Sequence, residues 1–119
     1  MTLEAKDLAR PDEKREFGHG EMELVELPGV TVGRAHMHPG WRWSNDVKPI
    51  VGTESCQQPH TMYVLSGKIH IVMDDGQEAD VEAGQSAVVS PGHDAWVVGD
   101  EDFVAIDWTA AATYATAPE

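Results

Sequence analysis

Basic residues are scarce in this sequence. Its 119 residues include 8 lysines and arginines against 21 aspartates and glutamates, which gives a formal net charge of −13. Nucleic acids and anionic membrane surfaces are bound through basic patches, so this charge balance argues against both kinds of partner. An acidic surface mainly favours solubility and identifies no partner by itself.

Cysteine and long apolar runs are also nearly absent. Cys56 is the one cysteine, which excludes an internal disulfide framework and fits a reducing compartment. No apolar stretch approaches membrane-spanning length, and residues 1–7 contain no apolar run flanked by positive charge. We therefore expect a cytoplasmic protein without a membrane segment.

The length suits one domain with a single core. Residues 1–20 are polar and charged, and we predict that they form an N-terminal arm. Residues 21–109 are predicted to form the folded domain. Residues 110–119, rich in alanine and threonine, are predicted to be a flexible C-terminal tail.

Short runs rich in valine, isoleucine, tryptophan and tyrosine alternate with turn signals through the central region. We predict strands over residues 22–27, 30–38, 41–44, 61–66, 68–73, 78–81, 86–89, 95–98 and 103–108. Glycine-containing turns separate most of them, and nearly all connections are too short for parallel crossovers. The sequence thus predicts an all-β fold with antiparallel sheets: a sandwich, barrel or jelly roll.

Two of these strands are apolar on both faces. In residues 61–66, Met62 and Val64 alternate with Tyr63 and Leu65, and residues 95–98 also lack alternation. A half-solvated antiparallel strand should alternate apolar with polar residues, so the second face needs a cover. We expect a homodimer to supply it.

The turn pattern resembles two motifs of a known family. The run Tyr63-Val64-Leu65-Ser66-Gly67 ends a strand at a glycine, and Ser90-Pro91-Gly92 ends another after a hairpin. This punctuation resembles the cupin superfamily, more narrowly its small single-domain bacterial members. The resemblance covers about residues 30–108 and implies a cupin-like double-stranded β-helix, a jelly-roll barrel, whose interior usually holds one metal ion.

The resemblance also marks four candidate metal ligands. Counting back from Gly67 places His60 where the family keeps a glutamate, and its His-x-His pair falls near Glu54 and Cys56. The histidine of the second motif falls on Ala95, and His93 lies two residues earlier. In an extended segment Glu54 and Cys56 would point the same way.

A thiolate, imidazole and carboxylate set of this kind favours Zn²⁺, or Fe²⁺ if further oxygen and nitrogen ligands join. Cys56 could equally be a small buried apolar residue, and His93 a turn residue that bonds backbone carbonyls.

A second histidine pair competes with this set. His36 and His38 resemble a His-x-His motif, but Arg42 and Trp43 stand where an acid should follow. His36 could still project into the barrel interior. We predict that the ligand cavity is lined by Trp41, Met62, Trp96 and His36.

Two functions remain open at this point. The first is a metal-binding cupin that binds or transforms a small organic molecule inside the barrel. The second is a metal-free binding or regulatory module whose apolar cavity holds such a molecule without catalysis. The fold alone names no reaction, because one fold hosts many chemistries.

Overall fold

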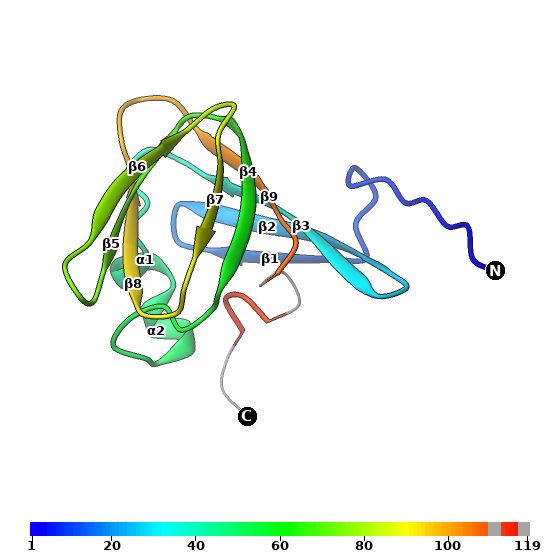
Figure 1. Cartoon of the computed structure of the whole chain (residues 1–119), viewed down its shortest axis with the longest axis horizontal. Coiled ribbons are helices and arrows are strands. Elements are labelled where there is room, and N and C mark those ends of the chain that lie inside the picture. Colours follow the sequence, from blue (N-terminus) through cyan, green and yellow to red (C-terminus); the bar gives the residue numbers. More distant parts are fainter. Residues whose placement is uncertain (110–112, 117–119) are drawn as a thin grey trace.

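The computed structural model describes residues 1–109 and 113–116. Its elements follow one another around two facing sheets (Figure 1). In chain order they are β1 (Glu13–Phe17), β2 (Gly20–Leu27), β3 (Val30–Met37), α1 (Trp43–Asp46), α2 (Lys48–Val51), β4 (His60–Ser66), β5 (Lys68–Met73), β6 (Glu78–Glu82), β7 (Ser86–Val89), β8 (His93–Val97) and β9 (Phe103–Asp107). All paired strands are antiparallel, which confirms the predicted all-β class.

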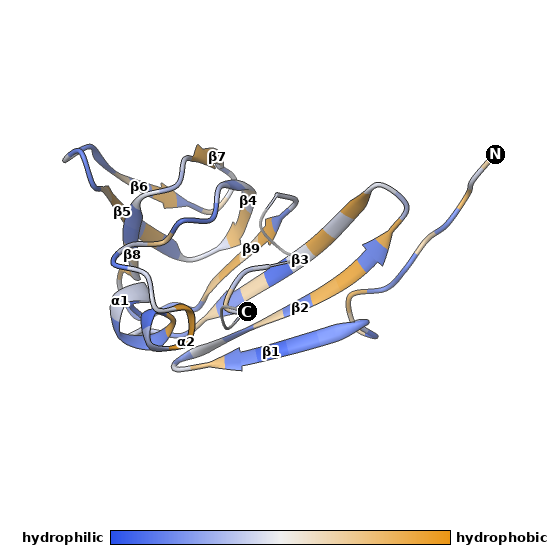
Figure 2. Ribbon diagram, turned by 90° about the horizontal axis from the view of Figure 1, so that it is seen from below, coloured by the Kyte–Doolittle hydropathy of each residue, from blue (hydrophilic) through white to orange (hydrophobic). Residues whose placement is uncertain are grey.

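The strands form two sheets. The larger has the order β1-β2-β3-β9-β4-β7, and the smaller has the order β6-β5-β8. After β4, the strands β5 and β6 lie in the smaller sheet, β7 in the larger, β8 in the smaller and β9 in the larger, so the chain winds around a common interior as a jelly-roll barrel (Figures 1 and 2). The predicted double-stranded β-helix is confirmed.

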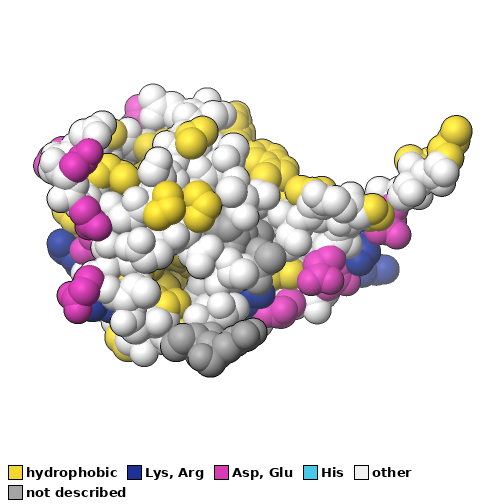
Figure 3. Space-filling view, turned by 60° about the horizontal axis from the view of Figure 1, so that its bottom comes forward, with side chains coloured by type: hydrophobic (Ala, Val, Ile, Leu, Met, Phe, Trp, Pro, Cys, Tyr) yellow, Lys and Arg dark blue, Asp and Glu magenta, His cyan; other side chains and the backbone are white. Residues whose placement is uncertain are grey.

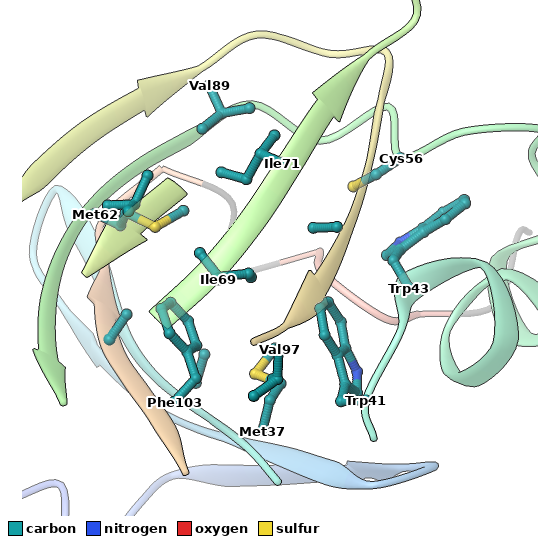
Figure 4. Packing of buried hydrophobic residues seen from close by; sticks show 14 of the residues in the cluster. Met37, Trp41, Trp43, Cys56, Met62, Ile69, Ile71, Val89, Val97 and Phe103 are labelled. Atoms are coloured by element: carbon teal, nitrogen blue, oxygen red, sulfur yellow. The ribbon is translucent and has the colours of Figure 1, made fainter. Parts of the chain in front are cut away.

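The barrel interior is filled by side chains that alternate along the strands. Met62 and Val64 point inward from β4, while Tyr63 and Leu65 point outward and are exposed. Figure 4 shows how these inward residues pack across the barrel. The buried cluster includes Met22, Met37, Trp41, Trp43, Val47, Cys56, Met62, Val64, Ile69, Ile71, Val89, Val97 and Phe103. On the face in Figure 3, acidic side chains lie around exposed hydrophobic ones.

The predicted turns are confirmed by their glycines. Gly29, Gly40, Gly84 and Gly92 all have positive φ angles, which glycine adopts without strain. Gly67 has a second constraint. A Cβ at this position would lie 2.8 Å from the Cα of Phe103 and would overlap the backbone of Asp102. The motif glycine therefore lets β4 and the start of β9 approach closely.

The strand predicted over residues 41–44 is wrong. Trp41 and Trp43 are both buried, which imitates strand alternation, but α1 begins at Trp43. Carboxylates satisfy the free N–H groups at this turn: Asp46 accepts from the Arg42 N–H at 2.9 Å, and Asp94 accepts from the Ser44 N–H at 3.1 Å. None of the helices in the described part of the chain is long and apolar enough to cross a membrane.

Described parts of both predicted terminal segments, 1–20 and 110–119, lie against the folded body. β1 lies within the predicted arm and pairs along its whole length with β2, so the larger sheet begins at residue 13. Residues 1–7 do extend away from the body (Figure 1). Residues 110–112 and 117–119 of the predicted tail lie outside the described residues. Between them, Tyr114 is buried against the core.

Candidate metal centre

Three predicted ligands meet at one end of the barrel. His60 begins β4 and His93 begins β8, on the two opposing sheets. Cys56 pairs with His93 in an isolated antiparallel bridge, in which the Cys56 N–H donates to the His93 carbonyl at 2.7 Å. Because bridged residues project their side chains to the same side, the thiol lies beside the His93 imidazole. Figure 4 shows the Cys56 sulfur pointing toward the barrel interior.

The three side chains are close and buried. Cys56 Sγ lies 3.8 Å from His60 Nε2, and the ring centroids of His60 and His93 are 5.1 Å apart. One candidate ligand atom from each residue lies within 4.8 Å of the other two. Their exposed fractions are 2, 8 and 3% in chain order.

Both imidazoles are anchored through their other nitrogen. His60 Nδ1 donates to Asp107 Oδ2 at 2.6 Å, and His93 Nδ1 donates to the Ser90 carbonyl at 2.9 Å. Metal-binding histidines typically donate their second N–H to a carboxylate or a backbone carbonyl in this way. These bonds leave Nε2 of each ring for the shared site.

The charges in this cluster are coupled. Burial opposes ionisation of the Cys56 thiol, but hydrogen bonds from His60 and His93 outweigh it and lower its pKa to about 6. Burial also opposes protonation of His60, yet Asp107 and the Cys56 sulfur raise its pKa to about 9. Without a metal, the pair is therefore a thiolate beside an imidazolium at neutral pH.

Two hollows adjoin the cluster. An interior cavity of about 40 Å³ is lined by His60, His93, Asp107, Tyr114 and apolar core residues. A hollow of about 210 Å³ lies next to it and is bordered by Trp43, Cys56 and Tyr114. The Tyr114 ring contacts His60, with centroids 5.6 Å apart, and it borders both spaces.

The family model of the EutQ-like cupin domain matches residues 30–114, which is more than half of the chain. The chain belongs to the EutQ-like cupin family. No curated protein matches it.

Solved structures resemble this cupin over most of its length. A protein of unknown function from Rhizobium leguminosarum has a TM-score of 0.64 at 18% identity, covering 92% of this chain and 97% of its own. A double-stranded β-helix protein from Klebsiella pneumoniae has a TM-score of 0.57 at 23% identity, covering 90% and 81%. A cupin-like protein from Thermotoga maritima has a TM-score of 0.57 at 15% identity, covering 87% and 80%. At these identities the likeness supports the fold alone.

The fourth predicted ligand, Glu54, does not belong to the cluster of this cupin. Its side chain is almost fully exposed, and its carboxylate lies 3.4 Å from Lys48 Nζ. The prediction assumed that residues 54–56 are extended, but the chain bends after α2, so Glu54 and Cys56 do not share a face.

Of the four residues predicted to line the ligand cavity, two line the interior cavity and two lie outside the barrel. Trp41 and Met62 line the interior cavity. Trp96 lies on the outer side of β8, stacked between the Arg42 guanidinium at 4.2 Å and the His70 ring at 4.8 Å. His36 lies on the outer side of β3, where it bonds Asp102.

Two site residues escaped the sequence analysis. Asp107 lies at an inward position of β9. The alternation that begins at Phe103 places this acidic residue on the buried face, and that pattern could have marked it as a site residue. Tyr114 is the one aromatic residue of the alanine- and threonine-rich tail. Nothing in its spacing shows that it returns to the barrel.

Proposed function

We propose that this cupin binds one divalent transition metal ion through Cys56, His60 and His93, and that a small organic molecule binds beside it. The observation that supports the proposal is the pair of buried imidazoles, both held through Nδ1, that face a buried thiolate. Apolar side chains would fill this part of the core better, because burying polar groups costs free energy. The set is therefore better explained by binding than by packing.

The donor set favours Zn²⁺ over Fe²⁺. Two imidazole nitrogens and one thiolate are common zinc ligands, whereas non-haem Fe²⁺ usually takes two histidines and a carboxylate. The nearest carboxylate, Asp107, already accepts the His60 N–H, so it orients a ligand. Three protein ligands leave a fourth position for water or a small molecule.

When bound, the metal would supply Lewis acidity to a water or to a polar group of the organic molecule. The protein residues prepare the surroundings. Asp107 fixes the His60 ring, Tyr114 excludes water from one side, and the 210 Å³ hollow next to Cys56 offers room for a small ligand.

A metal-free module that holds its ligand in the interior receives less support. The interior cavity measures about 40 Å³, enough for about one water molecule or an ion, but not for an organic molecule. Trp96, which should have walled a larger cavity, lies outside the barrel.

The same residues could also act without metal, as a nucleophile. Cys56, His60 and Asp107 form a line of contacts of 3.8 and 2.6 Å, and the pKa of the thiol is about 6. A thiolate paired with a histidine that a carboxylate orients is the arrangement of cysteine nucleophiles. Alkylation separates the two functions: in a metalloprotein, zinc should protect Cys56 from iodoacetamide and chelation should restore the reaction. A nucleophile without metal would react equally fast in both states.

Metal analysis of protein purified without an affinity tag tests the proposal. We expect about one zinc per chain after zinc loading and dialysis, and loss of this metal in His60→Ala. His70→Ala is the matched control, because His70 bonds acids on the outer sheet face and lies outside the cluster. Circular dichroism should show the same β structure in all three. Wild-type protein that takes up no zinc, or a His60→Ala variant in which added zinc still protects Cys56 from iodoacetamide, would contradict the proposal.

A further inference from the structure

A second group of ligand-type side chains lies outside the barrel, at the end of β3. His36 is on the outer face of β3, His38 directly follows the strand, and Asp102 directly precedes β9. Asp102 Oδ2 accepts from His36 Nε2 at 2.8 Å and lies 3.2 Å from His38 Nδ1. One candidate ligand atom from each residue lies within 4.8 Å of the other two.

The backbone of the group is held in place by separate hydrogen bonds. His36 pairs with β2 on one side and with β9 on the other. The His38 N–H donates to the His19 carbonyl at 2.7 Å, and the Asp102 carbonyl accepts from the Ser66 hydroxyl at 3.2 Å. The three side chains therefore project from a largely fixed frame.

The surroundings are acidic. Glu21 lies opposite His36 in the β2–β3 pairing. A second carboxylate therefore lies on the same sheet face, 2.7 Å from Lys14 Nζ. With a net charge of −13 on the chain, this region attracts cations.

We propose that His36, His38 and Asp102 form a second site for a divalent transition metal, independent of the site inside the barrel. Two imidazole nitrogens aim at one carboxylate oxygen, so an ion placed among them meets three donors. Each neutral imidazole would carry its proton on the other ring nitrogen when the ion binds. Nitrogen and oxygen donors suit Zn²⁺, Co²⁺ and Ni²⁺. The sequence lacks an acid shortly after His36 and His38, but the fold brings Asp102 next to them.

The site differs from the interior one in exposure. Its side chains are 32, 48 and 43% exposed, so water completes the coordination and binding is weaker than at a buried site. An ion here would join the end of β3 to the turn before β9. Because the unfolded chain does not hold these segments together, the ion stabilises the folded protein.

Titration of metal-free, tag-free protein with Co²⁺ tests the site. We expect two equivalents: one with a sulfur-to-cobalt charge-transfer band from Cys56, and a second without that band. His38→Ala and Asp102→Asn should lose the second equivalent and keep the band. Cys56→Ser should lose the band and keep the second equivalent.

His70→Ala serves as control, because it removes an outer-face histidine that also bonds acids, Asp80 and Glu78, but has no second histidine beside it. It should bind like the wild type. The site would be overturned if the wild type binds only cobalt that shows the charge-transfer band, or if the cobalt without the band survives His38→Ala. If no bound cobalt shows a charge-transfer band and the bound cobalt is lost in His38→Ala, the result would support this site and count against the interior one.

Discussion

At the scale of single residues, the protonation of His60 governs how the interior site takes up metal. In the metal-free protein the pKa of Cys56 is about 6 and that of His60 about 9. Between these values the thiol has already lost its proton and the imidazole still carries one. A metal ligand must be neutral at the bonding nitrogen, so binding must expel a proton from His60.

Calorimetry should detect this proton. At a pH midway between the two values, zinc binding should release about one proton from this pair, measured as the dependence of binding heat on buffer ionisation enthalpy. Affinity should rise about tenfold per pH unit as the pH climbs toward 9, because fewer His60 rings must be deprotonated. Binding heats and affinities that do not change with buffer or pH would contradict the pairing.

Asp107 tests the orienting role separately from ligation. Asp107→Asn keeps an oxygen that can accept from His60 Nδ1 but removes the charge. Loss of such an outer partner typically weakens metal binding about 10- to 100-fold, so we expect zinc to bind with that reduced affinity. A competition assay against a chelator measures it. Unchanged affinity would show that Asp107 only packs the barrel end.

Three site residues could be predicted because they lie at or near the motif positions that the resemblance to cupins marks, and the two histidines among them begin strands. His93 lies two residues before Ala95, so it keeps the inward face of β8 that the family uses for its histidine. Glu54 could not be judged in the same way, since the bend after α2 breaks the period. The prediction that His36 points into the barrel was wrong because the sequence does not show which side of β3 meets the core. Both sides of that strand carry apolar residues.

At the scale of elements, the turns could be predicted from the sequence, whereas the helix that depends on side-chain capping could not. The glycine turns were readable because positive φ angles demand that residue. The segment at Trp41 and Trp43 was misread because its helix depends on Asp46 and Asp94, and Asp94 lies fifty residues away. No local pattern contains that contact.

Gly67 offers a test at this scale. Gly67→Ala must adopt a φ of 76° and must also push the start of β9 away, whereas Gly29→Ala meets only the strain of φ 82° with open space around it. We expect the Gly29 change to lower the free energy of unfolding by about 1 kcal/mol and the Gly67 change by at least twice that. Denaturant titration measures both. Equal losses would show that the approach of β4 to β9 does not constrain this position.

At the scale of the whole molecule, one sheet face lacks charge. Within β4, β7 and β9, all fully described, the outward positions carry no acidic or basic side chain, although the chain as a whole is 24% charged. Four large apolar side chains are exposed there: Tyr63 at 39%, Leu65 at 51%, Val88 at 81% and Trp108 at 44%. The remainder of the face is formed by Thr61, Ser86, Val104 and Ile106.

The homodimer expected from the sequence stays a prediction, and this face is where we place it. Sedimentation should give the mass of two 13.0 kDa chains at micromolar concentration. Leu65→Glu should shift the protein to monomer, because it buries a charge at the contact. Gln77→Glu adds the same charge at an exposed turn and should leave the dimer intact. A wild-type monomer would leave this face without the partner we assign.

The central claim is that Cys56, His60 and His93 bind one metal ion together. X-ray absorption at the zinc edge, on tag-free protein loaded with one equivalent, measures the bonded atoms directly. We predict one sulfur at about 2.3 Å and two or more nitrogen or oxygen neighbours at about 2.0–2.1 Å, with the sulfur lost in Cys56→Ser. A zinc shell of nitrogen and oxygen only, unchanged by Cys56→Ser, would contradict it.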